Sequence, residues 1–226
     1  MFTFKQFTIH QDRCAMKVGT DGVLVGSWAE GGRRILDIGT GTGIVALMMA
    51  QRFPDSQVTA LELDKSSALQ AIDNVAASPF ASRVQVIHGA LQQYSSIPFD
   101  AIVSNPPYFT HAVAAKGTAR AMARQTDTLS YRDLCQCGRR LLAENGVMSI
   151  ILPADRYNEM EAEAAIAGLF LRRRVWIRTS SNKPPKRCLL AFGTHSVSVC
   201  EQATHAIMQD GKATPWYQSL VGKFYL

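Results

Sequence analysis

The residues best suited to chemistry in this 226-residue chain form one run, Asn105, Pro106, Pro107 and Tyr108. Prolines have a fixed φ and no N–H group, so the turn is rigid and its oxygens remain acceptors. The Asn105 side-chain oxygen and the Pro106 carbonyl can hold the N–H groups of an exocyclic amine and direct its lone pair outward. The ring of Tyr108 can stack on a nucleobase. A purely structural proline turn with a packed tyrosine is the alternative.

A glycine-rich loop earlier in the chain is suited to hold a cofactor. Asp37 and Ile38 lead into it, and it consists of Gly39, Thr40, Gly41, Thr42 and Gly43. Glycines allow a tight turn and a close approach of ligand atoms to the backbone. The spacing differs from a dinucleotide-binding loop because position 44 is Ile, and the acid at 37 disfavours a pyrophosphate but favours an ammonium group. The loop therefore predicts a cofactor with a cationic amino-acid end rather than NAD, with a structural glycine turn as the alternative.

Glu62 is the matching acid for a nucleoside, 23 residues after Gly39. An acid at the end of the second strand of nucleotide-binding α/β folds accepts hydrogen bonds from the ribose hydroxyls. Asp64 competes for this role, although a solvated acid that opens a helix is the simpler interpretation of Asp64. The glycine loop and Glu62, with its neighbour Leu63, resemble the S-adenosylmethionine site of class I methyltransferases.

The elements that must position these residues follow from short apolar runs that alternate with helical stretches. We predict strands at 34–38, 57–61, 84–87, 99–104 and 147–152, and helices at 44–52, 66–77 with a serine cap, 131–142 and 155–167. This alternation implies a parallel sheet with helices on both faces, which binds ligands at its carboxyl edge. Residues 169–178 and 187–192 are two further strands with no helix between them, which predicts an antiparallel edge strand. The expected fold is α/β and Rossmann-like, similar to the seven-stranded, mostly parallel sheet of class I methyltransferases.

The net charge of +6 arises from one stretch of the chain. The protein has 24 Lys and Arg against 18 Asp and Glu, and seven of the basic residues lie between positions 172 and 187, where there is no acid. The rest of the chain has 17 basic and 18 acidic residues. The stretch predicts a single basic edge for a polyanion, and a solvated surface cluster is equally consistent with the charge.

Two loops supply candidate contacts to RNA phosphates. The candidates are Lys183, Lys186 and Arg187 in and after a proline-containing loop, and Lys116, Arg120 and Arg124 in the loop that follows the 105–108 turn. Binding through such cations weakens steeply with salt. The alternatives are a charged guard on an edge strand for the first set and a solvent-exposed loop for the second.

Further segments carry a family resemblance. These are Phe-Lys-Gln-Phe at 4–7, His-Gln-Asp-Arg-Cys-Ala-Met-Lys-Val-Gly-Thr-Asp-Gly at 10–22 and Phe-Tyr-Leu at 224–226. With the 105–108 run, they resemble the bacterial tRNA1(Val) (adenine-37-N6)-methyltransferase family over nearly the whole chain. The resemblance implies one methyltransferase domain, 1–226, in which an N-terminal strand and helix extension, 1–30, covers the cofactor and Lys17, Thr20 and Asp21 enclose it. From the residues alone, Thr20 or Asp21 is a plausible helix cap.

The chain departs from the family beside the adenine of the cofactor. The family usually has an acid there, whereas this chain has Ala90. The adenine must then be recognised by backbone groups or by another side chain.

The resemblance implies a methyltransferase that uses S-adenosylmethionine to modify the N6 amine of an adenine in the anticodon loop of tRNA, adenine 37 of tRNA1(Val), with Asn105 also touching the cofactor. A protein glutamine N5-methyltransferase with the same turn is an alternative, although such enzymes normally carry a helical domain ahead of the sheet. DNA adenine methyltransferases usually add a larger recognition domain. A non-catalytic RNA-binding module would keep the basic stretch without binding the cofactor.

Composition excludes several other classes. The hydrophobic content of 47% rules out disordered and fibrous proteins. Apolar runs fall short of the ~18 residues of a membrane span, and no signal-peptide pattern opens the chain, so we expect a cytoplasmic protein. The five cysteines are scattered and have no metal-ligand spacing with the histidines, so we expect neither disulfides nor a metal site. A monomer is compatible with the sequence.

Overall fold

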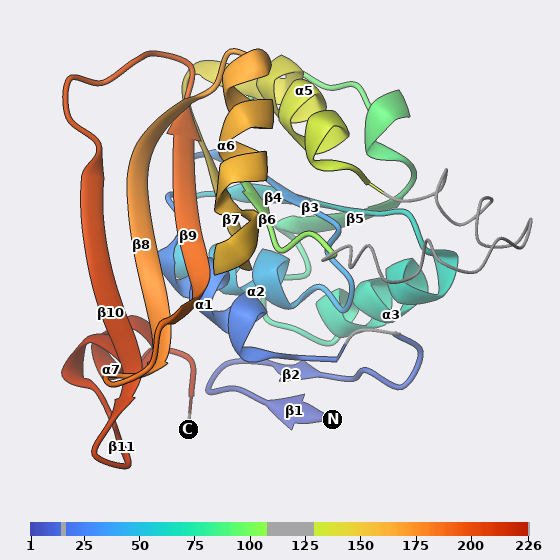
Figure 1. Cartoon of the computed structure of the whole chain (residues 1–226). Helices are drawn as coiled ribbons and strands as arrows, with labels where there is room; N and C mark the ends of the chain where they lie inside the picture. Colours follow the sequence, from blue (N-terminus) through green and yellow to red (C-terminus); the bar gives the residue numbers. More distant parts are fainter. Residues whose placement is uncertain (15–16, 108–128, 226) are drawn as a thin grey trace, which may run out of the picture.

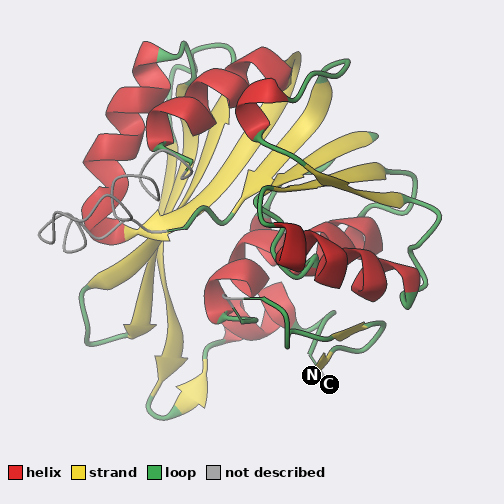
Figure 2. Ribbon diagram, turned by 90° about the vertical axis from the view of Figure 1, so that its right-hand side faces the viewer, coloured by secondary structure: helices red, strands yellow, loops and turns green. Residues whose placement is uncertain are grey.

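The computed structural model describes residues 1–14, 17–107 and 129–225, and a nine-stranded sheet with helices on both faces forms their centre (Figures 1 and 2). The strands of this sheet are β3 (Arg34–Ile38), β4 (Gln57–Glu62), β5 (Val84–His88), β6 (Phe99–Ser104), β7 (Leu142–Pro153), β8 (Phe170–Ser180), β9 (Pro185–Gly193), β10 (Glu201–Gln209) and β11 (Lys212–Ala213). Their order is β11-β10-β8-β9-β7-β6-β3-β4-β5. The five strands from β7 to β5 are parallel, as expected of strands joined by crossovers on the faces of the sheet.

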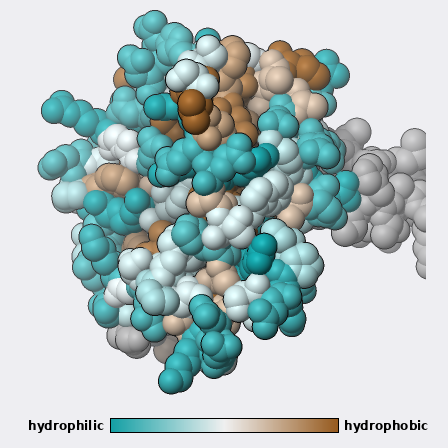
Figure 3. Space-filling view, turned by 60° about the vertical axis from the view of Figure 1, so that its left-hand side comes forward, coloured by the Kyte–Doolittle hydropathy of each residue, from teal (hydrophilic) through white to brown (hydrophobic). Residues whose placement is uncertain are grey.

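The predicted Rossmann-like fold is confirmed, and the sheet is two strands larger than the expected seven. β9 is antiparallel to both β7 and β8, so the antiparallel strand lies inside the sheet and not at its edge. β10 extends the sheet because it pairs in parallel with β8, and β11 pairs with β10. Most residues of β10 are polar or only partly buried, and this side of the molecule is largely hydrophilic (Figure 3). The apolar periodicity that reveals a strand is therefore weak there.

Helices on the two faces of the sheet enclose two apolar cores. One face carries α1 (Thr20–Trp28), α2 (Ile44–Arg52), α3 (Lys65–Ala76) and α7 (Pro215–Val221), and the other carries α5 (Tyr131–Leu141) and α6 (Tyr157–Ile166) (Figure 1). Leu47 is fully buried in the first core and Leu134 in the second. Replacement of either by Ala would cost about 2–5 kcal/mol of unfolding free energy. No helix in the described part of the chain is both long and apolar enough to cross a membrane.

Two predicted helix caps are wrong. α3 begins at Lys65 after Asp64, whose carboxylate accepts a hydrogen bond from the Ser67 backbone N–H at 2.8 Å, so an aspartate and not a serine caps this helix. This hydrogen bond is the main reason why the pKa of Asp64 is lowered. α1 begins at Thr20 after Gly19, which has no side chain to cap it, and Asp21 lies in the first turn instead.

The N-terminal extension is fixed to the face that carries α1. β1 (Phe2–Thr3) and β2 (Thr8–Ile9) form a separate antiparallel pair, and the Phe4 ring between them stacks on Phe7 and on Tyr225. The Lys5 backbone N–H donates to the Phe224 carbonyl at 2.8 Å. Segments near the two ends of the chain therefore lie side by side. From this anchor the extension runs towards the carboxyl edge of the sheet.

Candidate active site

The carboxyl ends of β3, β4 and β6 bring three predicted site residues together. Ile38 pairs with Leu61 on one side and with Ser104 on the other. The next residues are Gly39, Glu62 and Asn105, which leave the sheet side by side. The buried Ser104 hydroxyl donates to the Ile38 carbonyl at 2.9 Å and so fixes β6 to β3 at this edge. The strand order reverses here, which is where open α/β sheets bind their ligands.

The glycine loop leaves open space above its backbone. Gly39 and Gly41 have φ values of +70° and +56°, a region in which a side chain is strained. A Cβ atom at either position would meet no atom within 4 Å, so this space can take a ligand. The Gly39 N–H donates to the Leu61 carbonyl at 2.9 Å, which folds the loop towards β4. Gly43 has a packing role instead, because a Cβ there would lie 3.4 Å from the Ala71 side chain of α3.

Asp37 lies beneath the loop rather than in the open space. It is 1% exposed, and one carboxylate oxygen accepts hydrogen bonds from the Thr40 hydroxyl at 2.5 Å and from the Ala46 N–H at 3.0 Å. Asp37 thereby ties the loop to the first turn of α2. Burial raises the pKa of Asp37 to about 7, against the opposite effect of the two hydrogen bonds. A cation bound above the loop would favour the charged form and lower this pKa.

Glu62 is oriented by two backbone N–H groups. One carboxylate oxygen accepts a hydrogen bond from Gly41 at 2.8 Å, and the other accepts one from Asp64 at 2.9 Å. Each oxygen keeps a second lone pair for a further donor. Glu62 is therefore positioned beside the glycine loop and can accept hydrogen bonds from two hydroxyl groups of a ligand at once.

The predicted adenine side of the site has apolar side chains. Leu63 is 48% exposed, and its carbonyl lies 3.0 Å from Nε2 of His88. The Gly89 N–H donates to the Glu62 carbonyl at 2.8 Å. Ala90 is half-buried and precedes the short 3-10 helix η1 (Leu91–Gln93), whose start has no side-chain cap. Polar contacts to an adenine ring placed here would have to come from backbone groups or from residues elsewhere in the protein.

The predicted catalytic turn follows β6 directly. Asn105 is half-buried, Pro106 is buried and Pro107 is exposed. The predicted amine acceptors therefore lie at the same sheet edge as the glycine loop. Four predicted site residues lie outside the described residues, namely Tyr108, Lys116, Arg120 and Arg124.

Asn74 on α3 joins the N-terminal extension to the glycine loop and was not expected from the sequence. It is 1% exposed, its side-chain oxygen accepts from the His10 N–H at 2.9 Å, and its side-chain nitrogen donates to the His10 carbonyl at 2.8 Å and the Thr42 carbonyl at 2.9 Å. Gln70, one turn earlier, accepts from the Arg13 N–H at 3.3 Å. Two amides one turn apart on the buried face of a helix are the signal that could have identified this contact.

Residues predicted to enclose the cofactor are not all at the surface. Lys17 and Thr20 are exposed, whereas Asp21 is half-buried and accepts a hydrogen bond from Arg187 Nε at 2.8 Å. A residue predicted for the cofactor thus pairs with one predicted for RNA. Lys183 and Lys186, the other two predicted RNA contacts in this segment, are exposed.

The basic stretch does not form the predicted single edge. Arg173 lies 4.1 Å from the ring centre of Trp28 and 3.7 Å from the Glu30 carboxylate, on the face that carries α1. Arg174 lies 4.7 Å from the ring centre of Tyr157, on the face that carries α6. Successive residues of a strand point to opposite faces of the sheet, so the arginines of β8 are divided between them. The β8–β9 hairpin lies at the carboxyl edge of the sheet, because β9 begins next to the carboxyl end of β7. Its cations are therefore placed differently from the arginines within β8.

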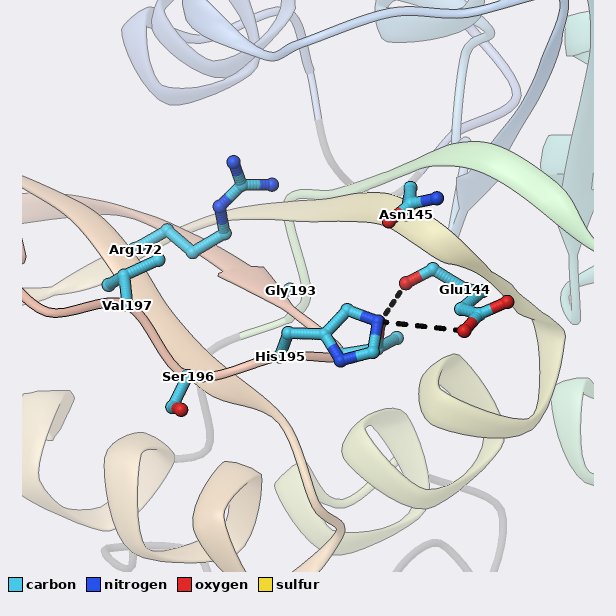
Figure 4. Close-up of a pocket in the computed structure, with 9 residues that line it drawn as sticks. Glu144, Asn145, Arg172, Gly193, His195, Ser196 and Val197 are labelled. Carbon is cyan, nitrogen blue, oxygen red and sulfur yellow. Dashed lines mark hydrogen bonds and ion pairs between the residues drawn. The ribbon is translucent and has the colours of Figure 1, made fainter.

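A hollow of about 240 Å³ lies at the opposite edge of the sheet, near the start of β7 and the end of β9 (Figure 4). Glu144, Arg172 and His195 contribute to its lining, and the His195 ring lies 4.0 Å from the Glu144 carboxylate. It is separate from the strand ends that carry the predicted site. Across residues 1–14, 17–107 and 129–225, no group of three or more His, Cys, Asp and Glu side chains could hold a metal ion.

Known proteins with this fold define the class. Residues 19–160 match the family model described as methyltransferase small domain. A predicted O-methyltransferase from Agrobacterium tumefaciens has a similar structure, with a TM-score of 0.68 and 20% identity over 90% of this chain and 96% of that chain. A methyltransferase from Pyrococcus furiosus has a TM-score of 0.56 and 22% identity over 76% and 80% of the two chains. The fold is that of the class I methyltransferases.

Full-length relatives narrow this class to one family. A protein from Aeromonas hydrophila is 45% identical over 100% of this chain and 97% of its own length, and one from Bacteroides fragilis is 42% identical with the same coverage. Both are named tRNA1(Val) (adenine(37)-N6)-methyltransferase. The chain belongs to the tRNA1(Val) (adenine(37)-N6)-methyltransferase family, which confirms the family expected from the sequence.

Proposed function

We propose that this protein transfers a methyl group from S-adenosylmethionine to the N6 amine of adenine 37 in the anticodon loop of tRNA1(Val). The observation that carries the proposal is that Gly39, Glu62 and Asn105 follow paired residues at adjacent strand ends. This arrangement supports a single site for a nucleoside cofactor and an amine. Relatives 40–45% identical to the chain are named for the same activity. A tRNA substrate would be met in the cytoplasm.

S-adenosylmethionine supplies an electrophilic methyl group bound to a sulfonium. The leaving group in methyl transfer is the neutral thioether. The open space over Gly39 and Gly41 fits its methionine part, because any side chain there would fill that space. The Asp37 carboxylate beneath the loop would attract the ammonium group, and Glu62 would accept hydrogen bonds from the ribose hydroxyls. The remaining cofactor contacts are assigned to Thr40, Leu63 and Ala90 in the domain, and to Lys17, Thr20 and Asp21 in the extension of residues 1–30, whereas Gly43 packs against α3.

The Asn105 side-chain oxygen and the Pro106 carbonyl accept hydrogen bonds from the two N–H groups of the adenine amine. These hydrogen bonds direct the nitrogen lone pair, otherwise delocalised into the ring, towards the methyl carbon. With the cofactor bound, the N–C bond would form as the C–S bond breaks, and the amine would then lose one proton to water. No side-chain base is required because the leaving group is already good, so catalysis is mainly positioning. Pro107 keeps the turn rigid and Tyr108 stacks on the base.

The exposed cations of the hairpin, Lys183 and Lys186, hold RNA phosphates beside the site. Lys116, Arg120 and Arg124 follow the catalytic turn and act on the flanking nucleotides. An adenine within a folded loop must leave its stack to reach Asn105, so contacts to the RNA backbone have to provide part of the binding energy.

Transfer of tritiated methyl groups from S-adenosylmethionine to total tRNA, followed by digestion to nucleosides, tests the proposal. We expect label in N6-methyladenosine, and none when a tRNA1(Val) transcript with guanine at position 37 is the substrate. Label in protein would favour a glutamine methyltransferase. Label in DNA or in another nucleoside would also overturn the proposal.

A further inference from the structure

An ion pair joins the N-terminal extension to the β8–β9 hairpin. Arg187 Nε lies 2.8 Å from Asp21 Oδ2, and the two side chains are 33% and 20% exposed. The residues are 166 positions apart in sequence, so this contact exists only in the folded chain. It connects a residue assigned to the cofactor with one assigned to RNA.

The Asp21 end of this pair lies next to the glycine loop. A Cβ atom on Gly22 would lie 3.6 Å from the side chain of Ile44 and 3.8 Å from that of Val45, the first two residues of α2. α2 starts directly after the glycine loop. The first turn of α1 therefore packs against the helix that the glycine loop opens, and Asp21 lies within that turn.

The start of α1 has little support of its own. Gly19 provides no side-chain cap, and the hydrogen bond from the Val23 N–H to the Gly19 carbonyl is long, at 3.4 Å. Just ahead of it, the Val18 N–H donates to the Gln11 side chain at 2.7 Å. From Gly22 to Ser27 the helix is buried. The pair with Arg187 therefore acts at the junction between residues 17–20, of which only Val18 is half-buried and the others are exposed, and a helix fixed in the core.

The Arg187 end of the pair is anchored in the sheet. Arg187 is paired with Pro153 of β7 and with Ile177 of β8, so its backbone is held on both sides. Lys183 and Lys186 are exposed at the hairpin, and within residues 1–14, 17–107 and 129–225 neither of them forms a salt bridge. Arg187 thus differs from Lys183 and Lys186 because its side chain is more buried and is paired with the Asp21 carboxylate.

We propose that Arg187 is a positioning residue for the cofactor. Through Asp21 it holds the first turn of α1, and with it residues 17–20, over the glycine loop. Lys183 and Lys186 bind RNA, and Arg187 does not belong functionally with them. The inference rests on the proposed function, since the ligand that α1 covers is S-adenosylmethionine.

Calorimetry with S-adenosylmethionine in the absence of RNA tests this role. We expect Arg187→Gln to raise the dissociation constant about tenfold, a coupling of ordinary size between two sites. Asp21→Asn should have an effect of at least this size, and adding Arg187→Gln to it should change little further. Lys186→Gln removes the same charge from an adjacent position and should leave cofactor affinity unchanged. In steady-state assays, Arg187→Gln should raise KM for the cofactor more than KM for tRNA.

A cofactor affinity of Arg187→Gln equal to that of the unchanged protein, with loss of RNA affinity alone, would overturn the inference. Additive effects of Asp21→Asn and Arg187→Gln would also contradict it. Thermal unfolding identifies variants that fail to fold, and the exchanged pair, Asp21→Arg with Arg187→Asp, keeps the test decisive. Recovery of cofactor affinity in the exchanged pair supports the inference, and a folded exchanged pair that stays weak counts against it. Failure of the unchanged protein to bind S-adenosylmethionine would instead overturn the proposed function.

Discussion

The two sides of the site are built on different physical principles. On the β3–β4 side, polar groups are held by hydrogen bonds within the protein, since Glu62 accepts from two backbone N–H groups and Asp37 ties the glycine loop to α2. On the hairpin side, Lys183 and Lys186 are exposed. The first side is preorganised before a ligand arrives, whereas the second relies on charge.

This difference matches the two ligands. A small cofactor presents the same groups at every turnover, so a rigid site loses little entropy when it binds. A folded RNA is recognised through its phosphates, and the attraction between exposed charges is screened by salt. Changes on the cofactor side should therefore act independently of salt, and changes on the hairpin should not.

The largest effect is expected at Asn105, where the two sides meet. Asn105→Ala removes an acceptor for the amine and should lower kcat by about 10²- to 10³-fold, as for other preorganised polar groups in active sites. Single-turnover methyl transfer measures this rate, and calorimetry should show nearly normal cofactor affinity. Asn145→Ala, at an exposed amide on the opposite edge of the sheet, is the matched control and should keep the normal rate. Loss of cofactor binding with residual turnover would contradict the role of Asn105.

Glu62 tests the preorganised side alone. Glu62→Ala removes a charged acceptor for two hydroxyl groups and should raise the cofactor dissociation constant by about 10- to 100-fold. The ratio to the unchanged protein should be the same at low and high salt. Glu201→Ala, at an exposed acid at the start of β10, should have no such effect. If the ratio of dissociation constants fell towards one at high salt, Glu62 would act mainly through its charge, as Lys183 and Lys186 are expected to do.

Lys183 and Lys186 test the electrostatic side. Replacement of both by Gln should raise KM for tRNA about tenfold. It should also reduce the slope of log affinity against log salt by roughly 1.5, because each lost phosphate contact contributes about 0.7–0.9 to that slope. Cofactor affinity should not change. Arg33→Gln with Arg139→Gln removes the same charge from exposed positions at the opposite edge and serves as the control. An equal effect of both pairs would mean that net charge alone attracts the RNA.

The prediction for Asp37 is measured in stability, not in activity or binding. Burial raises its pKa from an ordinary 3.8 to about 7, so between these pH values the folded protein binds more protons at this group than the unfolded chain does. Its contribution to the unfolding free energy is therefore present at low pH and lost as pH rises to about 7, with a slope of up to about 1.4 kcal/mol per pH unit. Urea unfolding at several pH values should show this slope in the unchanged protein and not in Asp37→Asn. Identical pH profiles would contradict it.

Local pattern was sufficient for most of the fold. The predicted helix 44–52 and strand 99–104 coincide with α2 and β6, because continuous apolar runs specify buried elements. The same reasoning missed β10, because none of its residues is fully buried and its apolar periodicity is weak. It also assigned the wrong cap to α3, since Asp64 and the serines that follow it are all good capping residues and only the backbone geometry selects among them.

The sequence by itself determined which chemical groups are present and which strand ends carry them. The acceptors of the 105–108 turn, the glycine loop and Glu62 are local features, and parallel strands bring such features to one edge. Tertiary structure alone decided their partners. Asp21 meets Arg187, and Asn74 joins His10 to the glycine loop, because strand order and helix packing bring distant segments together. The arginines of β8 are divided between two faces because side chains alternate along a strand, a fact that a count of charges does not contain.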